Sequence, residues 1–199
     1  MSSSDVGKKS WRLFLAASLN DSVRNALAKS MAELDPLASL INQSRIEAIH
    51  LTLHFMGAVE SSRVPELSAE LARAIAPFAA FELLVSGAGA FPSPRRPRVI
   101  WAGISGSGRA ELAEIHRASA KPLRSAGIDL DDRAYAPHLT LGRLRRDPRT
   151  IEREPISQWM QRWEGADFGR LEVGALYLMR SDLSVRPPQY TVVESFALQ

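Results

Sequence analysis

The sequence contains no cysteine, and this absence excludes several classes of site. Without a thiol among the 199 residues, there is no disulfide framework, zinc ribbon, iron–sulfur cluster or cysteine nucleophile. Histidine is also scarce, with four residues in the chain. Any catalysis that depends on an imidazole must therefore use some of these four side chains.

Long apolar runs are missing as well. None approaches the roughly 20 consecutive apolar residues of a membrane-spanning helix. The apolar segment 13–19 is short and directly follows Arg12, so a buried strand is favoured over a secretion signal. We expect a cytoplasmic protein with no membrane partner, in which residues 1–10 form a flexible tail and residues 11–199 form one domain.

The basic side chains are mostly arginine. There are 21 Arg and 4 Lys against 22 acidic residues, which gives a formal net charge of +3 and a pI near 9.6. The planar guanidinium group grips phosphate oxygens in pairs, so this composition fits an anionic ligand. Net charge alone also fits an ordinary solvated surface.

Hydrophobic periodicity and turn residues predict a mixed order of strands and helices. Expected strands cover residues 12–17, 49–56, 81–85, 99–104, 136–141, 169–179 and 189–197. Expected helices cover residues 23–34, 65–78, 109–125 and 157–163, and residues 87–97 are expected to form a loop. The elements lack regular βαβ spacing, which indicates an α+β fold with antiparallel sheet.

The tetrapeptide His-Leu-Thr-Leu occurs twice, at residues 50–53 and 138–141. An exact repeat of this kind is rare by chance at ordinary composition, so it suggests two lobes of similar build. In a strand, His50 and Thr52 point to one face while the leucines point to the core, and His138 and Thr140 do the same. Each copy thus displays one imidazole and one hydroxyl together.

Two imidazoles facing each other are suited to general acid–base catalysis at phosphorus, because one can donate a proton while the other accepts one. The threonine hydroxyls can donate to phosphate oxygens. The same alternation predicts that Phe55 lies in the core and that His54 shares the face of His50. His116, in a predicted helix, is expected to be structural or solvent-facing.

A metal site is the alternative use of the histidines, since His50 and His54 have the i, i+4 spacing of helical zinc ligands. In a strand, however, this spacing spans about 13 Å, which is too far for one ion. We therefore expect neither a metal nor any other cofactor.

The second tetrapeptide lies within Tyr-Ala-Pro-His-Leu-Thr-Leu-Gly-Arg at residues 135–143. With the first copy, the opening segment 12–16 and the segment 91–101, it resembles the two-histidine (2H) phosphoesterase superfamily. Within that superfamily the chain is similar to the RNA 2′,3′-cyclic phosphodiesterases, historically called 2′-5′ RNA ligases. The resemblance covers nearly the whole chain.

This resemblance implies an α+β, bilobal, pseudo-two-fold fold with two mostly antiparallel sheets and flanking helices around a central groove. It also implies a metal-independent reaction that opens an RNA terminal 2′,3′-cyclic phosphate to a 2′-phosphate. The implied partner is an RNA with such an end, for instance one derived from tRNA. Separately, we expect the protein to be a monomer.

The resemblance also implies roles for five residues. His50 resembles the general acid that protonates the leaving 3′ oxygen, and His138 the base that activates water. Thr52 and Thr140 would hold phosphate oxygens, and Arg143 would stabilise the developing charge.

Two groups of arginines are candidates for contact with an RNA backbone. Arg95, Arg96 and Arg98 precede an expected strand, while Arg145 and Arg146 follow the second tetrapeptide. A solvated run of charge is the alternative interpretation of both groups.

Three other functions stay open at this point. The enzyme could perform reversible 2′-5′ RNA ligation, or it could act on small cyclic nucleotides or ADP-ribose phosphates. A non-catalytic RNA-binding module with the same fold is the third.

Overall fold

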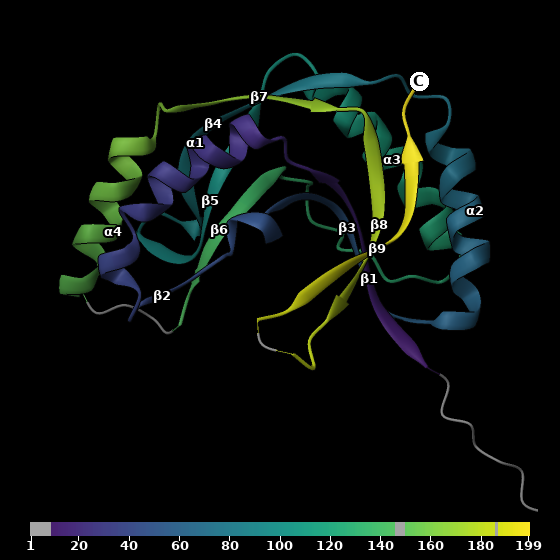
Figure 1. Ribbon diagram of the computed structural model, residues 1–199, viewed down its shortest axis with the longest axis horizontal. Helices are drawn as coiled ribbons and strands as arrows, with labels where there is room; N and C mark the ends of the chain where they lie inside the picture. The colour runs from purple at the N-terminus through teal and green to yellow at the C-terminus, as the bar shows by residue number, and fades with distance from the viewer. Residues whose placement is uncertain (1–8, 146–149, 186) are drawn as a thin grey trace, which may run out of the picture.

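Nine strands form one antiparallel sheet that curls through the middle of the molecule (Figure 1). The structure is a computed structural model, and it describes residues 9–145, 150–185 and 187–199. The strands are β1 (Ser10–Ser18), β2 (Ile41–Gln43), β3 (His50–Glu60), β4 (Phe81–Ser93), β5 (Arg96–Ser105), β6 (His138–Leu144), β7 (Asp167–Val173), β8 (Ala175–Asp182) and β9 (Gln189–Ala197). The helices are α1 (Asp21–Ala32), α2 (Val64–Ile75), α3 (Arg109–Ser125) and α4 (Thr150–Trp163).

The order of the strands is nearly symmetric about the centre of the sheet. It runs β7-β4-β5-β6-β3-β1-β8-β9, so four strands lie on each side of the β6/β3 junction, and β2 pairs with β6 off this path. At the junction the register holds one pair, Leu51 with Leu139. The α+β class with mostly antiparallel strands is thus confirmed, and the two expected sheets are continuous through this pair.

Local sequence explains where the helices begin and end. The Asn20 side chain accepts a hydrogen bond from the backbone N–H of Val23 at 3.0 Å and so caps α1. Helix α3 occupies residues 109–125 as predicted, and Gly127 ends it with φ of +72°, a conformation that favours glycine. Leu112, Ile115 and Leu123 form its buried face.

Two helices cross to the opposite half of the sheet. Helix α1 follows β1 in the chain but packs against β7, and the Asn20 amide donates to the carbonyl of Arg170 at 2.9 Å. Helix α3 follows β5 but packs against β3 and α2. Figure 1 accordingly shows α1 beside α4 on one side and α3 beside α2 on the other.

The structure differs from the sequence prediction around residues 87–97, where we expected a loop. Strand β4 instead continues to Ser93 and pairs with β5 up to the hairpin end. A Cβ on Gly89 would lie 2.4 Å from the Trp101 ring, so this glycine makes room for the tryptophan and does not mark a turn. The expected strand 169–179 is likewise divided, with Gly174 between β7 and β8.

Most of the predicted tail, residues 1–10, lies outside the described residues, and Ser10 is already the first residue of β1. Among the described residues, no helix is both long and apolar enough to cross a membrane.

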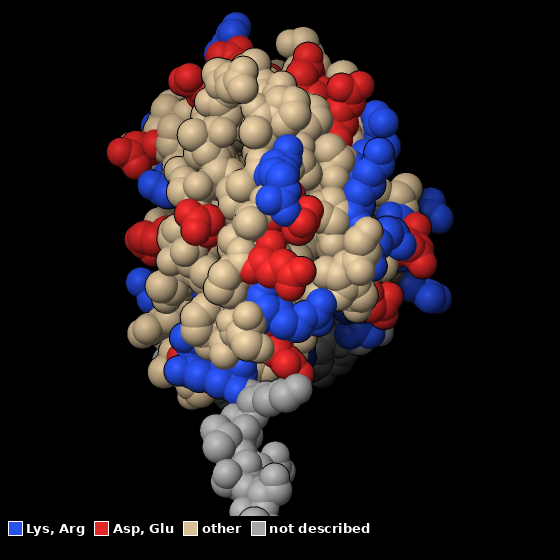
Figure 2. Space-filling model, turned by 90° about the vertical axis from the view of Figure 1, so that its right-hand side faces the viewer, with Lys and Arg blue, Asp and Glu red and all other residues tan. Residues whose placement is uncertain are grey.

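An open groove of about 830 Å³ lies between α2 and α3. Charged residues along it have both signs and include Arg63, Glu66, Glu70 and Lys121. Figure 2, which views the molecule from this side, shows blue and red side chains interspersed. No large surface of one charge is visible in this view, and the groove is not lined by any of the histidines.

Candidate active site

The two tetrapeptides lie next to each other at the centre of the sheet. Leu51 and Leu139, which pair across the junction, are both fully buried. Their neighbours His50, Thr52 and His138 are half-buried on the opposite face, which we call the open face of the sheet. The alternation predicted for these residues is therefore confirmed.

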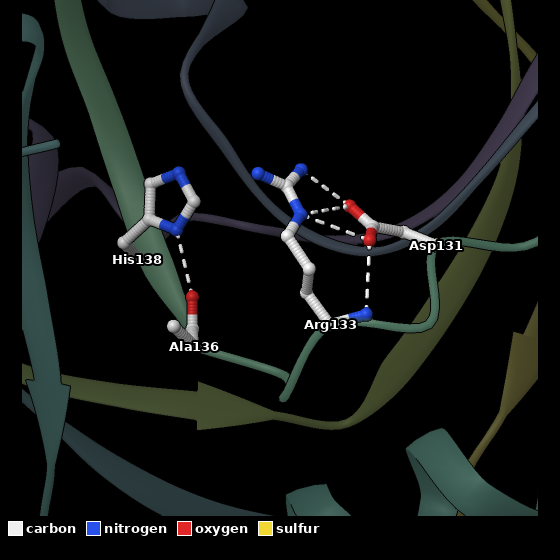
Figure 3. A network of polar contacts seen from close by, with 4 residues as sticks. All are labelled: Asp131, Arg133, Ala136 and His138. Atoms are coloured by element: carbon white, nitrogen blue, oxygen red, sulfur yellow. Dashed lines mark hydrogen bonds and ion pairs between the residues drawn. The ribbon is translucent and has the colours of Figure 1, made fainter. Parts of the chain in front are cut away.

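Both imidazoles are fixed in the same way. In each copy Nδ1 lies 2.8 Å from the backbone carbonyl two residues earlier, that of Ala48 for His50 and that of Ala136 for His138 (Figure 3). A carbonyl only accepts, so Nδ1 carries the hydrogen in each neutral ring. Nε2 is then the atom that can exchange a proton, and in the described part of the chain it has no hydrogen-bond partner in either ring.

The two rings have different neighbours. The His50 ring stacks on Phe14 with centroids 4.6 Å apart, and Tyr190 meets it edge-on at 5.3 Å. The His138 ring contacts the edge of Phe91 at 4.8 Å. Burial lowers the pKa of both imidazoles, and the positive charge of Arg143 lowers the pKa of His138 further. Both rings are therefore biased toward the neutral form.

A β-bulge lies at the last leucine of the tetrapeptide in each strand. In β3 the partner of Leu15 is His54 and the partner of Ala16 is Thr52, so Leu53 is the extra residue. In β6 the same shift leaves Leu141 as the extra residue opposite β5. Because a bulge moves later side chains to the other face, the sixth residue of each copy joins the open face.

The bulges change the expected faces of Phe55 and His54, and they place Arg143 on the open face. Phe55 is 65% exposed instead of lying in the core. His54 does not share the face of His50, because it is 5% exposed and lies beneath α3. Arg143, the sixth residue of the second copy, is exposed and close enough to His138 to affect its pKa.

His54 belongs to a stack of three rings behind the site. The His54 and His116 rings lie 4.2 Å apart, and His116 lies 4.0 Å from Tyr135 in nearly parallel planes. Nε2 of His54 donates to the carbonyl of His116 at 2.9 Å, and burial lowers the pKa of His54 to about 4. His116 is thus structural, which is one of the two roles expected for it. His54 is neutral at physiological pH.

Tyr135 connects the two tetrapeptides directly. It lies three residues before His138, and its hydroxyl donates to the backbone carbonyl of Thr52 at 3.0 Å. Burial raises the pKa of this phenol, so it stays a hydrogen-bond donor. The sequence shows a tyrosine next to the second copy but contains no signal for its partner 83 residues away.

The two threonines of the tetrapeptides lie on the open face. Thr52 lies opposite Ala16 and Thr140 opposite Trp101, both on the open face. Among the described residues, neither hydroxyl has a hydrogen-bond partner in the protein. Each hydroxyl can therefore donate to an oxygen of a ligand that lies between the histidines.

The predicted RNA-contacting arginines are not gathered at the histidines. Arg95 and Arg96 lie at the β4–β5 hairpin end. Gly103, the partner of His138, is seven positions farther along β5 than Arg96, which is about 23 Å in a strand. Arg98 is also exposed, and its side chain lies on the other face of β5 from that of Trp101. Arg145 Nε donates to the carbonyl of Ala38 at 3.3 Å. Arg146 lies outside the described residues.

A further arginine that the sequence analysis did not single out is held in place shortly before the second copy. Arg133 Nε lies 2.9 Å from Oδ1 of Asp131, whose carboxylate also accepts from the backbone N–H of Arg133 at 3.0 Å. These bonds lower the pKa of Asp131 to about 2. In Figure 3 the Nη1 end of Arg133 points to the side of the view where His138 lies. The sequence Asp-Asp-Arg shortly before the second copy was the available signal.

Metal-ligating side chains are not clustered in the part of the chain that the structure describes. No group of three or more His, Asp or Glu residues there could hold a metal ion.

Comparison with known proteins places the chain among phosphoesterases. Residues 18–101 match the family of LigT-like phosphoesterases. A protein of Thermus thermophilus named RNA 2′,3′-cyclic phosphodiesterase is 33% identical, over 94% of this chain and 90% of its own. One of the same name from Archaeoglobus fulgidus is 28% identical, over 93% of this chain and 99% of its own. The crystal structure of TT0787 of T. thermophilus superposes with a TM-score of 0.75 at 31% identity and covers 94% of this chain and 97% of that one.

Proposed function

The chain belongs to the family of LigT-like phosphoesterases, and we propose that it is an RNA 2′,3′-cyclic phosphodiesterase that works with His50 and His138 as general acid and base. The relatives' shared name supports the activity. The observation that carries the proposal is the matched fixation of the two rings, each with Nδ1 on a backbone carbonyl and Nε2 left available.

In the proposed reaction, water adds to phosphorus and the bond from phosphorus to the 3′ oxygen breaks. Nε2 of His138 takes a proton from the water, and protonated Nε2 of His50 gives a proton to the 3′ oxygen. The products are a 2′-phosphate and a free 3′ hydroxyl, so atoms and protons balance. His138 ends protonated and His50 neutral, and exchange with solvent restores the starting states.

The substrate anion itself helps to prepare the acid. Both free imidazoles have a lowered pKa, and a phosphate between them raises it, because a nearby opposite charge favours the protonated form. Thr52 and Thr140 would hold the two non-bridging oxygens, and Arg143 would stabilise the charge that builds up on them. No step in this scheme requires a metal ion.

One incubation tests activity, position of cleavage and metal dependence together. An RNA oligonucleotide ending in 2′,3′-cyclic phosphate is treated with the full-length protein in excess EDTA, and the product is identified by ³¹P NMR. We expect complete conversion to the 2′-phosphate. A 3′-phosphate product would overturn the assignment of the leaving oxygen, loss of activity in EDTA would overturn metal independence, and no hydrolysis at all would overturn the function.

A further inference from the structure

His116, on α3, occupies the middle of the ring stack behind the site. Its ring lies 4.2 Å from that of His54 and 4.0 Å from that of Tyr135, with interplanar angles of 23° and 7°. Burial and the positive charge of Arg124 lower the pKa of His116, so the middle ring is neutral at physiological pH. The stack therefore joins α3, β3 and the segment before β6 through flat, uncharged faces.

His54 is the fixed end of this stack. Its side chain is 5% exposed, and its Nε2 lies 2.9 Å from the carbonyl of His116 and 3.1 Å from the hydroxyl of Ser119. Ser119 is fully buried, and its hydroxyl donates to the carbonyl of Ile115 at 2.7 Å. Because the bond to residue 116 is made to its backbone, a substitution of the His116 side chain keeps both anchors of His54.

Tyr135, at the other end of the stack, belongs to a segment without regular structure. Residues 128–137 form neither helix nor strand, so their position depends strongly on contacts of their side chains. The ring of Tyr135 lies on His116, and its hydroxyl donates to the carbonyl of Thr52 at 3.0 Å. One contact comes from α3 and the other from β3, and together they fix the plane and the direction of this ring.

The connection from Tyr135 to His138 is short and stiff. It consists of Ala136 and Pro137; proline has a fixed φ angle, and the residue before a proline is restricted to extended conformations. The carbonyl that holds Nδ1 of His138 at 2.8 Å is that of Ala136. The placement of Tyr135 therefore sets the direction of this carbonyl, and the carbonyl sets which nitrogen of His138 carries the hydrogen.

The equivalent carbonyl beside His50 is held in a different way. Ala48 is the last residue of a 3₁₀ helix at residues 46–48, and its backbone N–H donates within the same turn at 2.9 Å. In the first copy, Glu47 stands where the second copy has Tyr135. A hydrogen-bonded turn thus holds the carbonyl of the first copy, whereas the ring stack holds that of the second.

We propose that His116 is a positioning residue for the reaction, whose ring, held between His54 and Tyr135, fixes the segment before β6 and keeps Nε2 of His138 ready to accept a proton. His116 acts through Tyr135 and the carbonyl of Ala136. This inference rests on the proposed function, because it takes His138 to be the base.

Two substitutions separate the flat ring of His116 from the rest of the side chain. His116→Leu has a similar volume but no flat face, whereas His116→Phe keeps one. For an RNA oligonucleotide ending in 2′,3′-cyclic phosphate, His116→Leu should lower kcat about 10-fold and change KM less than about 2-fold, because misplacement of a reacting group affects mainly the chemical step. His116→Phe should keep at least about half of the wild-type kcat. Equal losses in the two variants, or full activity in His116→Leu, would overturn the proposal.

Trp163→Leu is the matched control. The Trp163 ring stacks on that of Phe168 with centroids 5.6 Å apart, and these residues lie in α4 and β7, which contribute no ring to the stack behind the site. Like His116→Leu, the control should lower the midpoint of thermal unfolding, but it should leave kcat unchanged at a temperature well below that midpoint. A comparable loss of kcat in Trp163→Leu would attribute the effect to general destabilisation and would overturn the assignment.

The tautomers of the two histidines give a measurement that does not depend on hydrolysis. The ¹⁵N NMR signals of the imidazoles are recorded without substrate at about pH 8, where both rings are neutral. In wild type, His50 and His138 should carry the hydrogen on Nδ1. In His116→Leu, His138 should show a mixture of tautomers while His50 is unchanged. That mixture would support the positioning of His138 even if the RNA is not hydrolysed, and a single tautomer of His138 in this variant would overturn the inference even in an active enzyme.

Discussion

The candidate site consists of two half-sites, residues 50–55 on β3 and residues 138–143 on β6. They have the same backbone arrangement but carry different side chains beyond the tetrapeptide. Both have the histidine anchored to a carbonyl, the threonine on the open face and the bulge at the last leucine. The fifth residue is His54 in one and Gly142 in the other, and the sixth is Phe55 or Arg143.

Each difference has a structural reason on its own side of the sheet. His54 faces α3, where it bonds to the carbonyl of His116. Gly142 faces β2, and a Cβ there would lie 2.8 Å from Ile41. On the open face, one half-site is aromatic and the other cationic. The comparison teaches that a repeated backbone can place two imidazoles symmetrically while the sixth position presents an aromatic ring in one copy and a cation in the other.

Removal of either histidine should have the largest effect. His50→Ala and His138→Ala should each lower kcat by at least about 10³-fold. The residual activity tells the two half-sites apart, since loss of the acid removes the alkaline limb of the pH profile of kcat/KM and loss of the base removes the acidic limb. For wild type, the lowered pKa values predict a maximum below pH 6.5.

Thermal unfolding of both variants serves as the control, and their midpoints should match the wild type within a few degrees. If His50→Ala lost the acidic limb instead, the roles of the two half-sites would be reversed. Retention of more than a tenth of the activity in either variant would remove that histidine from the mechanism.

Substitution of Arg143 tests the cationic half-site. Arg143→Gln should lower kcat about 10²-fold, because it removes a charge that stabilises the transition state. The pKa of His138 should rise, since Arg143 lowers it in the wild type, whereas the pKa of His50 should stay unchanged. An NMR titration of the imidazole C–H signals measures both. Equal shifts of the two pKa values would contradict a local effect confined to the β6 half-site.

The dependence of stability on pH tests His54, the fifth residue of the half-site on β3. The pKa of His54 is about 4 in the folded chain and near 6.5 when unfolded, so below pH 6.5 the unfolded state binds the extra proton and stability falls. Between pH 6.5 and 5 the unfolding free energy should decrease by up to about 2 kcal/mol. In His54→Gln, denaturant unfolding across this range should show a flatter curve. An unchanged slope would place the acid sensitivity on another group.

The smallest effect on activity is expected from a change in Tyr135, whose hydroxyl joins the two half-sites. Tyr135→Phe keeps the ring stacked on His116 but removes the bond to the Thr52 carbonyl, so it should cost about 1 kcal/mol of stability. It should lower kcat a few-fold and leave KM unchanged, because the histidines would be less exactly spaced. Tyr177→Phe is the stability control, since no described residue bonds to its hydroxyl. A kcat equal to wild type would make Tyr135 purely structural.

Much of the site could be predicted from the sequence because it depends on short periodic segments. The repeated tetrapeptide predicts two strands with His50 and His138 on equivalent faces, and helix 109–125 follows from its apolar spacing and Gly127. The bulges could not be predicted in this way. They arise from the pairing of β3 with β1 and of β6 with β5, and strict alternation therefore gave the wrong faces for His54 and Phe55.

Other features were not predicted because they too depend on contacts between residues that are distant in the sequence. The glycine at position 89 indicated a loop, although in the structure it lies beneath the Trp101 ring. The bond from Tyr135 to Thr52 spans 83 residues, and no local pattern indicates it. Arg133 was not singled out because its orientation depends on the bonds it makes to Asp131.

The exchanged helices and the return of β8 and β9 to β1 make the two halves of the sheet interdependent. Each half of the repeat lends one helix, α1 or α3, to the other half, so a polypeptide consisting of one half would leave part of its own sheet uncovered. Because β8 and β9 complete the half that begins with β1 and β3, a cut between β3 and β4 would also leave that half without two of its four strands. The two histidines are therefore held together by a fold that neither segment of the chain can form alone.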